Sequence, residues 1–248
     1  MGDVTGVGAA DPAPSGAPSA TLVLVHGAWH GPWCWELLLP HLRGSGLTVQ
    51  CPALPSMDSS TPAGLAEDAQ QLGAVLSRID GPVVLCGHSY GGMVISAADL
   101  SQANVRHLVY LCAYLTEAGE SMAASLRAAG ERRPGHWIRP LAQGRTGVDP
   151  QRAVALFYAD CTDATQSWAA ARLRPQWAQV GGESAAQPNW QRIPSTYVAC
   201  GADRALAPAI QRGVYGPRAQ RFITLDSGHS PFLSQPQTLA PVLASIAQ

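Results

Sequence analysis

The chain has 248 residues, 46% apolar and 13% charged, which is enough to bury one large core but too few for two ordinary α/β domains. Its formal net charge is -1 at pH 7, so it lacks the positive field that holds a nucleic acid or an anionic membrane surface. All 16 basic residues are arginine, which excludes Schiff-base lysine chemistry and the Walker P-loop, because both require an amine.

The first 20 residues are rich in Gly, Pro, Ala and Ser and contain neither a basic residue nor an apolar core. We predict a flexible leader over 1–20 and no secretory signal. No later apolar stretch approaches transmembrane length. The six cysteines form no CxxC pair, so we expect free thiols, no metal and no other cofactor. These features predict a cytoplasmic protein without a nucleic-acid or membrane partner, and they leave its oligomeric state open.

From residue 21 onward, short apolar runs alternate with segments of helical period. The runs have the length of strands but no strict apolar–polar alternation, as expected of strands buried on both faces. They are residues 21–26, 47–51, 82–86, 105–112, 195–200 and 220–225. The alternation of strand and helix predicts an α/β fold with a doubly wound, mostly parallel sheet in one domain over 21–248.

Three segments have clear helical patterns, namely residues 62–80, 91–102 and 235–247. In the first, a cap at Ser59, Ser60 or Thr61 and an early helical Pro62 precede an apolar stripe. The stripe consists of Leu65, Ala69, Leu72 and Leu76.

The segment from about 116 to 191 interrupts this rhythm. It shows no convincing strand, and helical patterns occupy 119–129, 150–160 and 165–173. An insertion of this length after a core strand predicts a helical lid. Four of the seven tryptophans lie in it, each serving either ordinary packing or substrate contact. They are Trp137, Trp168, Trp177 and Trp190.

A G-x-S-x-G motif spans Gly87 to Gly91 between an apolar run and a helical segment. The bare motif is weak evidence in a chain with 25 glycines. A strand, a sharp turn and a helix together are the arrangement that holds a serine hydroxyl exposed in a strained elbow. The context therefore predicts that Ser89 is a nucleophile.

A serine hydroxyl is too weakly acidic to attack unaided, so Ser89 needs a base and an orienting acid. His229 is the best base because it follows the last predicted strand, where Gly228 permits a tight loop. In this architecture the acid ends the preceding strand, which favours Asp203 over Asp226. We expect Asp226 to cap its loop instead.

The other histidines fit structural roles better. His26 and His30 lie in the loop after the first strand, whereas His41, His107 and His136 suit surface or packing positions in a helix, a strand and the insertion.

An oxyanion intermediate also needs hydrogen-bond donors. We expect these to be the backbone N–H groups of Tyr90, after the nucleophile, and of Ala28, in the loop after the first strand. In that loop Gly27 lets the backbone approach the substrate. The predicted substrate-binding residues are Gly27, Trp29, His30 and Trp137.

Four segments, VLVHGAWHGPWCW, GHSYGGM, ACGADRAL and DSGHSPF, together resemble the α/β-hydrolase superfamily. More narrowly, they are similar to the plant methylesterase, salicylate-binding esterase and hydroxynitrile lyase group and its bacterial esterase relatives. The resemblance covers residues 20–248. It implies that Ser89, His229 and Asp203 form a catalytic triad and that Ala28 and Tyr90 are the oxyanion donors.

The same resemblance separates chemistries. Cyanogenic lyases carry threonine where this chain has Gly27 and lysine where it has Ser230. Epoxide hydrolases and haloalkane dehalogenases place aspartate where Ser89 stands. Ester hydrolysis is therefore the implied reaction.

We thus expect a cofactor-free serine hydrolase that cleaves a small, fairly apolar carboxylic ester. Two other functions fit the same residues. One is serine-dependent acyl transfer, lactone formation or cyclisation in a biosynthetic pathway, and the other is small-molecule binding on a hydrolase scaffold. A complete triad argues against pure binding.

Overall fold

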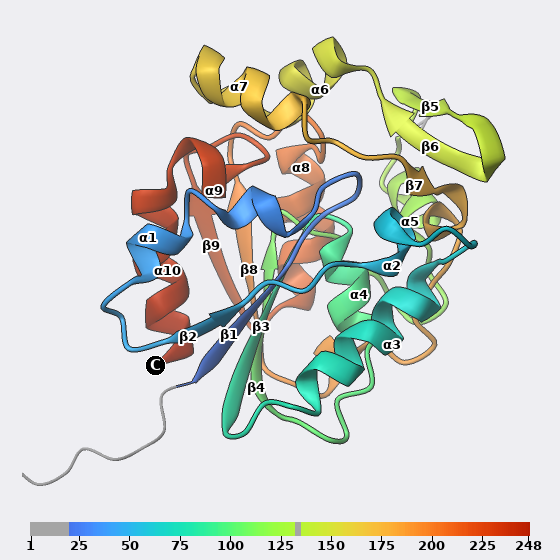
Figure 1. Cartoon of the computed structure of the whole chain (residues 1–248). Coiled ribbons are helices and arrows are strands. Elements are labelled where there is room, and N and C mark those ends of the chain that lie inside the picture. Colours follow the sequence, from blue (N-terminus) through green and yellow to red (C-terminus); the bar gives the residue numbers. More distant parts are fainter. Residues whose placement is uncertain (1–19, 132–134) are drawn as a thin grey trace, which may run out of the picture.

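The computed structural model describes residues 20–131 and 135–248, so the leader predicted for 1–20 lies outside the described residues except for Ala20. Within them, six parallel strands form a central sheet in the order β2-β1-β3-β4-β8-β9 (Figure 1). This confirms the predicted doubly wound parallel sheet. The strands are β1 (Thr21–Val25), β2 (Thr48–Gln50), β3 (Pro82–His88), β4 (Asn104–Leu111), β8 (Ser195–Cys200) and β9 (Arg221–Leu225).

Alternate side chains of the sheet supply two separate cores, because successive residues of a strand point to opposite faces. Leu22 and Leu24 of β1 pack in the core beneath α1 (Leu39–Leu42) and α10 (Pro236–Ala247). Val23 and Val25 pack in the other core, beneath α3 (Leu65–Leu76) and α4 (Gly91–Ala97). Burial on both faces explains why the strand sequences do not alternate between apolar and polar residues.

Helix α3 begins later than the sequence predicts. Its apolar stripe is buried as expected, but the helix starts at Leu65, so the cap predicted within 59–62 is wrong. Carboxylates cap it instead: Glu67 Oε2 accepts a hydrogen bond from Gly64 N at 2.6 Å, and Glu183 accepts one from Leu65 N. Glu183 arrives from a distant part of the chain, so local sequence does not reveal this cap.

The residues between β4 and β8, including the predicted lid at 116–191, are hereafter the insertion. Parts of it lie across the carboxyl ends of the sheet strands (Figure 1). It contains α5 (Met122–Ala128), α6 (Pro150–Phe157) and α7 (Asp163–Ala170), close to the predicted helices. It also contains an antiparallel sheet of β5 (Ile138–Pro140), β6 (Arg145–Val148) and β7 (Gln176–Trp177).

The expectation that this segment has no strands is therefore wrong. Its strands have only two to four residues, which is too short to show a periodic pattern. Short helical turns complete the fold. They are η1 (Pro32–Trp35), α2 (Pro55–Asp58), η2 (Ala142–Gly144), η3 (Ala178–Gly181), η4 (Asn189–Gln191), α8 (Pro208–Ile210), η5 (Gln211–Tyr215), η6 (Gly216–Arg218) and α9 (Pro231–Ser234).

All six cysteines are free thiols, as predicted. Among the described residues, no helix is long and apolar enough to cross a membrane.

Candidate active site

Ser89 stands at a sharp turn between β3 and α4. Its φ angle of 52° lies in the left-handed region that side chains rarely adopt. The flanking glycines are required by backbone packing. A Cβ atom at Gly87 would lie 2.5 Å from the Gly91 carbonyl oxygen, and one at Gly91 would lie 2.4 Å from the Val25 oxygen. The turn places Ser89 on the wall of a cavity of about 230 Å³.

His229 and Asp203 meet where the carboxyl ends of β8 and β9 lie together. Both are buried, and His229 Nδ1 lies 2.7 Å from Asp203 Oδ2. The carboxylate also accepts hydrogen bonds from Gln211 Nε2 at 2.8 Å and from the N–H groups of Ala205 and Leu206 at 2.8 and 2.9 Å. Four donors suit an ionised carboxylate. Because Nδ1 donates to this carboxylate, Nε2 of His229 is left as an acceptor.

Sequence reasoning missed Gln211, which holds the acid in place. Its side chain is fully buried, donates to Asp203 and to the Leu206 carbonyl, and accepts from Cys200 N at 3.0 Å. No spacing pattern marks such a residue. Asp226, by contrast, is exposed, and its side chain makes no hydrogen bond to any described residue, so its predicted loop-capping role is wrong.

Ser89 and His229 line the same cavity, whereas Asp203 lies behind His229. The Ser89 hydroxyl makes no hydrogen bond to His229 in this structure. Catalytic hydrogen bonds are often long before substrate binds, so this gap is compatible with a nucleophile and its base.

Two backbone N–H groups beside Ser89 have no acceptor among the described residues. They belong to Ala28 and Tyr90, and both residues line the cavity. Trp29, which follows Ala28, has a φ angle of 59° and turns the loop at this point. Unpaired N–H groups of residues that line one cavity can receive the negative oxygen of a tetrahedral intermediate.

Gly27 does not line the cavity, so its predicted contact with substrate is wrong. A Cβ atom there would lie 2.8 Å from His88 Nδ1 and 3.0 Å from Ser89 Cβ. The residue is glycine because the elbow packs directly against this loop.

The three other predicted substrate-binding residues, Trp29, His30 and Trp137, do line the cavity. Of the insertion's tryptophans, Trp168, Trp177 and Trp190 lie outside it. Trp168 packs edge-on against Trp33, with the ring centroids 5.3 Å apart. The indole N–H groups of Trp177 and Trp190 donate to main-chain carbonyls. His136, predicted to have a surface or packing role, is exposed and contributes to the cavity wall.

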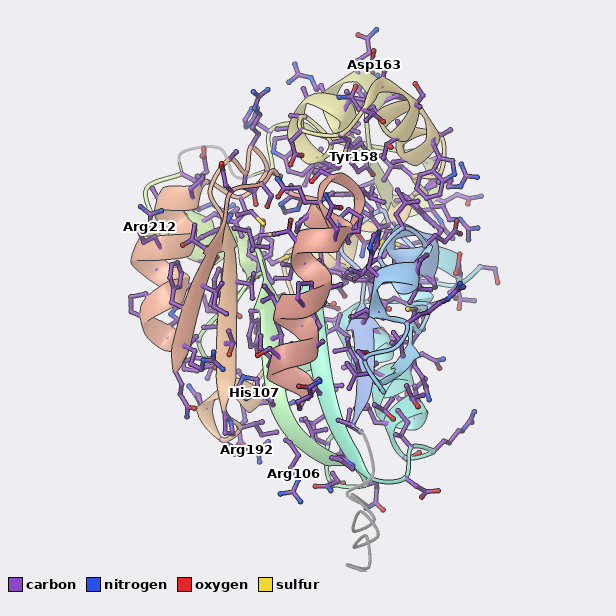
Figure 2. All side chains as sticks on the ribbon, turned by 90° about the vertical axis from the view of Figure 1, so that its left-hand side faces the viewer. Arg106, His107, Tyr158, Asp163, Arg192 and Arg212 are labelled. Atoms are coloured by element: carbon purple, nitrogen blue, oxygen red, sulfur yellow. The ribbon has the colours of Figure 1, made fainter. Side chains whose placement is uncertain are left out.

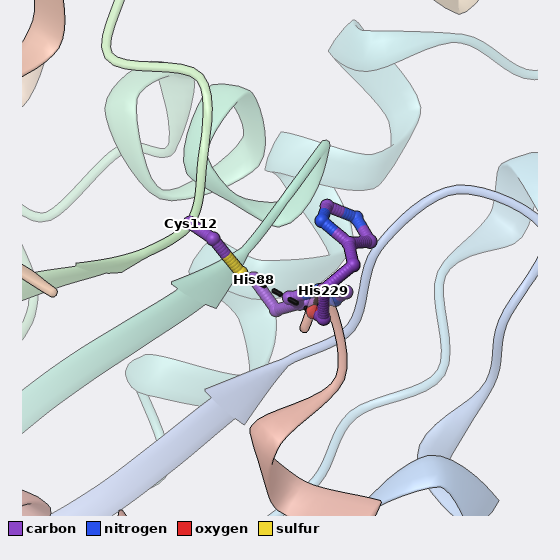
Figure 3. A group of neighbouring side chains, drawn as sticks. All are labelled: His88, Cys112 and His229. Atoms are coloured by element: carbon purple, nitrogen blue, oxygen red, sulfur yellow. Dashed lines mark hydrogen bonds between the residues drawn. The ribbon is translucent and has the colours of Figure 1, made fainter. Parts of the chain in front are cut away.

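The loop that carries His229 is held by the side chains of His88 and Cys112 (Figure 3). His88 Nε2 and Cys112 Sγ lie 2.9 and 3.3 Å from the main-chain oxygen of His229. Burial raises the pKa of the Cys112 thiol well above its usual value, so the thiol keeps the proton that it donates. These three residues could offer metal-ligating atoms within 4.8 Å of one another, but this geometry directs His88 and Cys112 to a backbone oxygen.

Comparison with known proteins decides the family. The sequence profile of the alpha/beta hydrolase family matches residues 22–242. The chain belongs to the α/β-hydrolase family.

Several relatives of this hydrolase are named as esterases. Methylesterase 18 of Arabidopsis thaliana is 30% identical over 91% of this chain and 96% of its own length. A carbendazim hydrolyzing esterase of a Nocardioides species is 40% identical, over 44% of this chain and 48% of its own. The crystal structure of a pyrethroid hydrolase from Sphingobium faniae has a TM-score of 0.81 at 25% identity and covers 92% of this chain and 97% of that one. These relatives confirm the resemblance and support ester hydrolysis in general.

The hydrolase keeps three histidines uncharged around its elbow. Burial lowers the pKa of His26 to about 4 and that of His30 to about 3, and it lowers the pKa of His88 well below its usual value. His30 Nδ1 lies 2.7 Å from the Ala28 carbonyl oxygen, so the neutral ring must carry its hydrogen on Nδ1.

Proposed function

We propose that this protein is a serine hydrolase that cleaves small, apolar carboxylic esters through an acyl-enzyme intermediate. One observation carries the proposal. A single cavity is lined by Ser89 in a strained elbow, by His229 bonded to a buried Asp203, and by the unpaired N–H groups of Ala28 and Tyr90.

In this mechanism Ser89 attacks the ester carbonyl while His229 Nε2 takes its proton. Asp203 keeps the imidazole in the required tautomer and stabilises the imidazolium that forms. The N–H groups of Ala28 and Tyr90 donate to the oxyanion. His229 then returns the proton to the leaving alcohol, and a water molecule activated by His229 releases the acid.

The cavity wall supports an apolar substrate. Trp29, Trp137 and Phe157 form an aromatic part, whereas Met122 and Leu126 belong to an aliphatic part. Apart from the proposed catalytic groups and the loop residues beside them, the wall contains few ionisable residues. Three of these, Glu131, His136 and Arg204, are exposed. A cavity of about 230 Å³ is small compared with the roughly 300–1,000 Å³ usual for drug-sized ligands, which favours a small ester.

One hydroxyl interrupts the apolar wall. Tyr114 follows β4, lines the cavity, and its hydroxyl makes no hydrogen bond to any described residue. Its backbone N–H donates to the Ser89 carbonyl at 3.1 Å, which places the residue beside the elbow. The Tyr114 hydroxyl offers one hydrogen-bonding partner to an otherwise apolar substrate.

Covalent labelling with a fluorophosphonate, combined with a panel of p-nitrophenyl, methyl and aryl esters, tests the proposal. We expect wild-type protein to be labelled and to hydrolyse short apolar esters. Ser89→Ala should abolish labelling and lower kcat by about three orders of magnitude or more. Ser77→Ala, which removes an exposed hydroxyl, should change neither result. Equal labelling of wild type and Ser89→Ala would refute the proposal.

A further inference from the structure

One turn of the insertion reaches both loops that carry the proposed catalytic groups. The turn joins α6 to α7 and comprises residues 158–162. Tyr158 lies on the side of the insertion that faces the sheet, whereas Asp163 lies at its outer end (Figure 2). The ring centroid of the adjacent Phe157 lies 5.6 Å from that of His229 and 6.2 Å from that of Trp29.

The first contact runs from Tyr158 to the oxyanion loop. The Tyr158 hydroxyl lies 2.8 Å from His30 Nε2, and both residues are buried. His30 Nδ1 donates to the Ala28 carbonyl, so Nε2 of the neutral ring accepts and the phenol donates. The hydroxyl therefore favours the tautomer of His30 that donates to the carbonyl of Ala28, the residue whose N–H is a proposed oxyanion donor.

The second contact runs from Asp160 to the histidine loop. Asp160 Oδ2 accepts a hydrogen bond from Gly228 N at 2.7 Å, one residue before His229. A Cβ atom at Gly228 would lie 2.4 Å from Asp160 Oδ1. Gly228 does not have a positive φ angle. It is glycine because the Asp160 carboxylate occupies the space of a side chain.

We infer that Tyr158 and Asp160 are positioning residues that set the oxyanion loop and the histidine loop relative to Ser89, an inference that rests on the proposed function. Neither residue appears among those that line the cavity. Because the donors and the base act on charge that develops in the transition state, small errors in their position should lower kcat and leave KM nearly unchanged.

Tyr158→Phe tests the first contact, because it removes only the hydroxyl. We expect kcat to fall about 10- to 100-fold, less than the roughly 100- to 1,000-fold typical of deleting an oxyanion donor outright, with KM within about twofold of wild type. The rate of fluorophosphonate labelling should fall by a similar factor. In proton NMR, the His30 Nδ1–H resonance should shift or broaden.

Tyr215→Phe is the matched control. Its hydroxyl is also buried and hydrogen-bonded, to Ser125 Oγ at 3.1 Å, but it lies outside the cavity wall. This variant should keep the wild-type kcat and the wild-type His30 resonance. If Tyr158 has a purely structural role, Tyr158→Phe should behave like Tyr215→Phe: its melting temperature should fall and its kcat should stay close to wild type.

Asp160 is tested by rescue and by a double variant. Asp160→Ala should lower kcat about tenfold, and Asp160→Asn, which keeps an acceptor oxygen for Gly228 N–H, should recover part of the loss. Gly228→Ala should displace the carboxylate and reproduce the effect of Asp160→Ala, and the double variant should be no worse than either single one.

The outcomes separate the two claims. If wild type shows no Ser89-dependent labelling, the proposed function fails. If wild type is labelled and both Tyr158→Phe and Asp160→Ala keep kcat within about twofold of wild type, the positioning role alone is overturned. Additive losses in the double variant would refute the direct contact between Asp160 and the histidine loop.

Discussion

Lowering the pH from 7 to 5.5 protonates three histidines in the unfolded chain that the folded protein keeps neutral. Burial holds the pKa of His26 at about 4 and that of His30 at about 3, and it places the pKa of His88 well below 6.5. Each folded pKa lies below the unfolded value, so the unfolded state binds more protons as the pH falls. The stability from keeping these rings neutral is therefore present above pH 6.5 and is lost on acidification.

The size of the effect follows from the number of protons. Over this interval each histidine costs about 1.3 kcal/mol, so the three together should lower the free energy of unfolding by about 4 kcal/mol. That is a large part of the roughly 5–15 kcal/mol typical of a domain. Asp68, whose pKa burial raises, works in the opposite direction, because the folded state binds its proton more readily.

Urea unfolding at closely spaced pH values measures this dependence. The slope of the unfolding free energy against pH should correspond to nearly three protons at pH 5.5. His26→Gln should reduce the slope by about one proton, whatever it does to stability itself. His41→Gln is the control, because His41 is exposed at the end of α1, and it should leave the slope unchanged. A wild-type slope below one proton, or equal slopes for the two variants, would refute the reasoning.

Three further predictions concern the chemistry. Asp203→Asn should keep the fold but lower kcat by about four orders of magnitude, because the amide favours the wrong imidazole tautomer. Asp226→Asn should keep kcat within about twofold of wild type. Steady-state kinetics on both variants would reassign the acid if Asp226→Asn proved the more damaging change. Trp137→Ala should change the relative kcat/KM among esters of different acyl size, and Trp168→Ala, outside the cavity, should lower thermal stability without that shift. Wild type should release cyanide from mandelonitrile no faster than buffer does. Cyanogenic lyases carry threonine where this chain has Gly27 and lysine where it has Ser230, but a Cβ at Gly27 would lie 3.0 Å from Ser89 Cβ and the chain has no lysine. Substantial Ser89-dependent cyanide release would overturn the esterase assignment.

The sequence alone was sufficient for the sheet and for the order of the proposed catalytic groups. Strands buried on both faces leave uninterrupted apolar runs, and the turn at Ser89 needs glycine on both sides, so both features are written in neighbouring residues. The chain order of Ser89, Asp203 and His229 then follows from where parallel strands end.

Only the tertiary structure decided which distant residues support that site and which one caps α3. Glu183 caps α3, Asp160 fills the space beside Gly228, and Tyr158 favours one tautomer of His30. The strands β5 to β7 likewise form only by pairing with one another. The contacts of Glu183, Asp160 and Tyr158 join residues far apart along the chain, and a single hydrogen bond or steric contact imposes no periodicity and no fixed spacing on the sequence. Such contacts become visible only when the folded backbone brings their partners together.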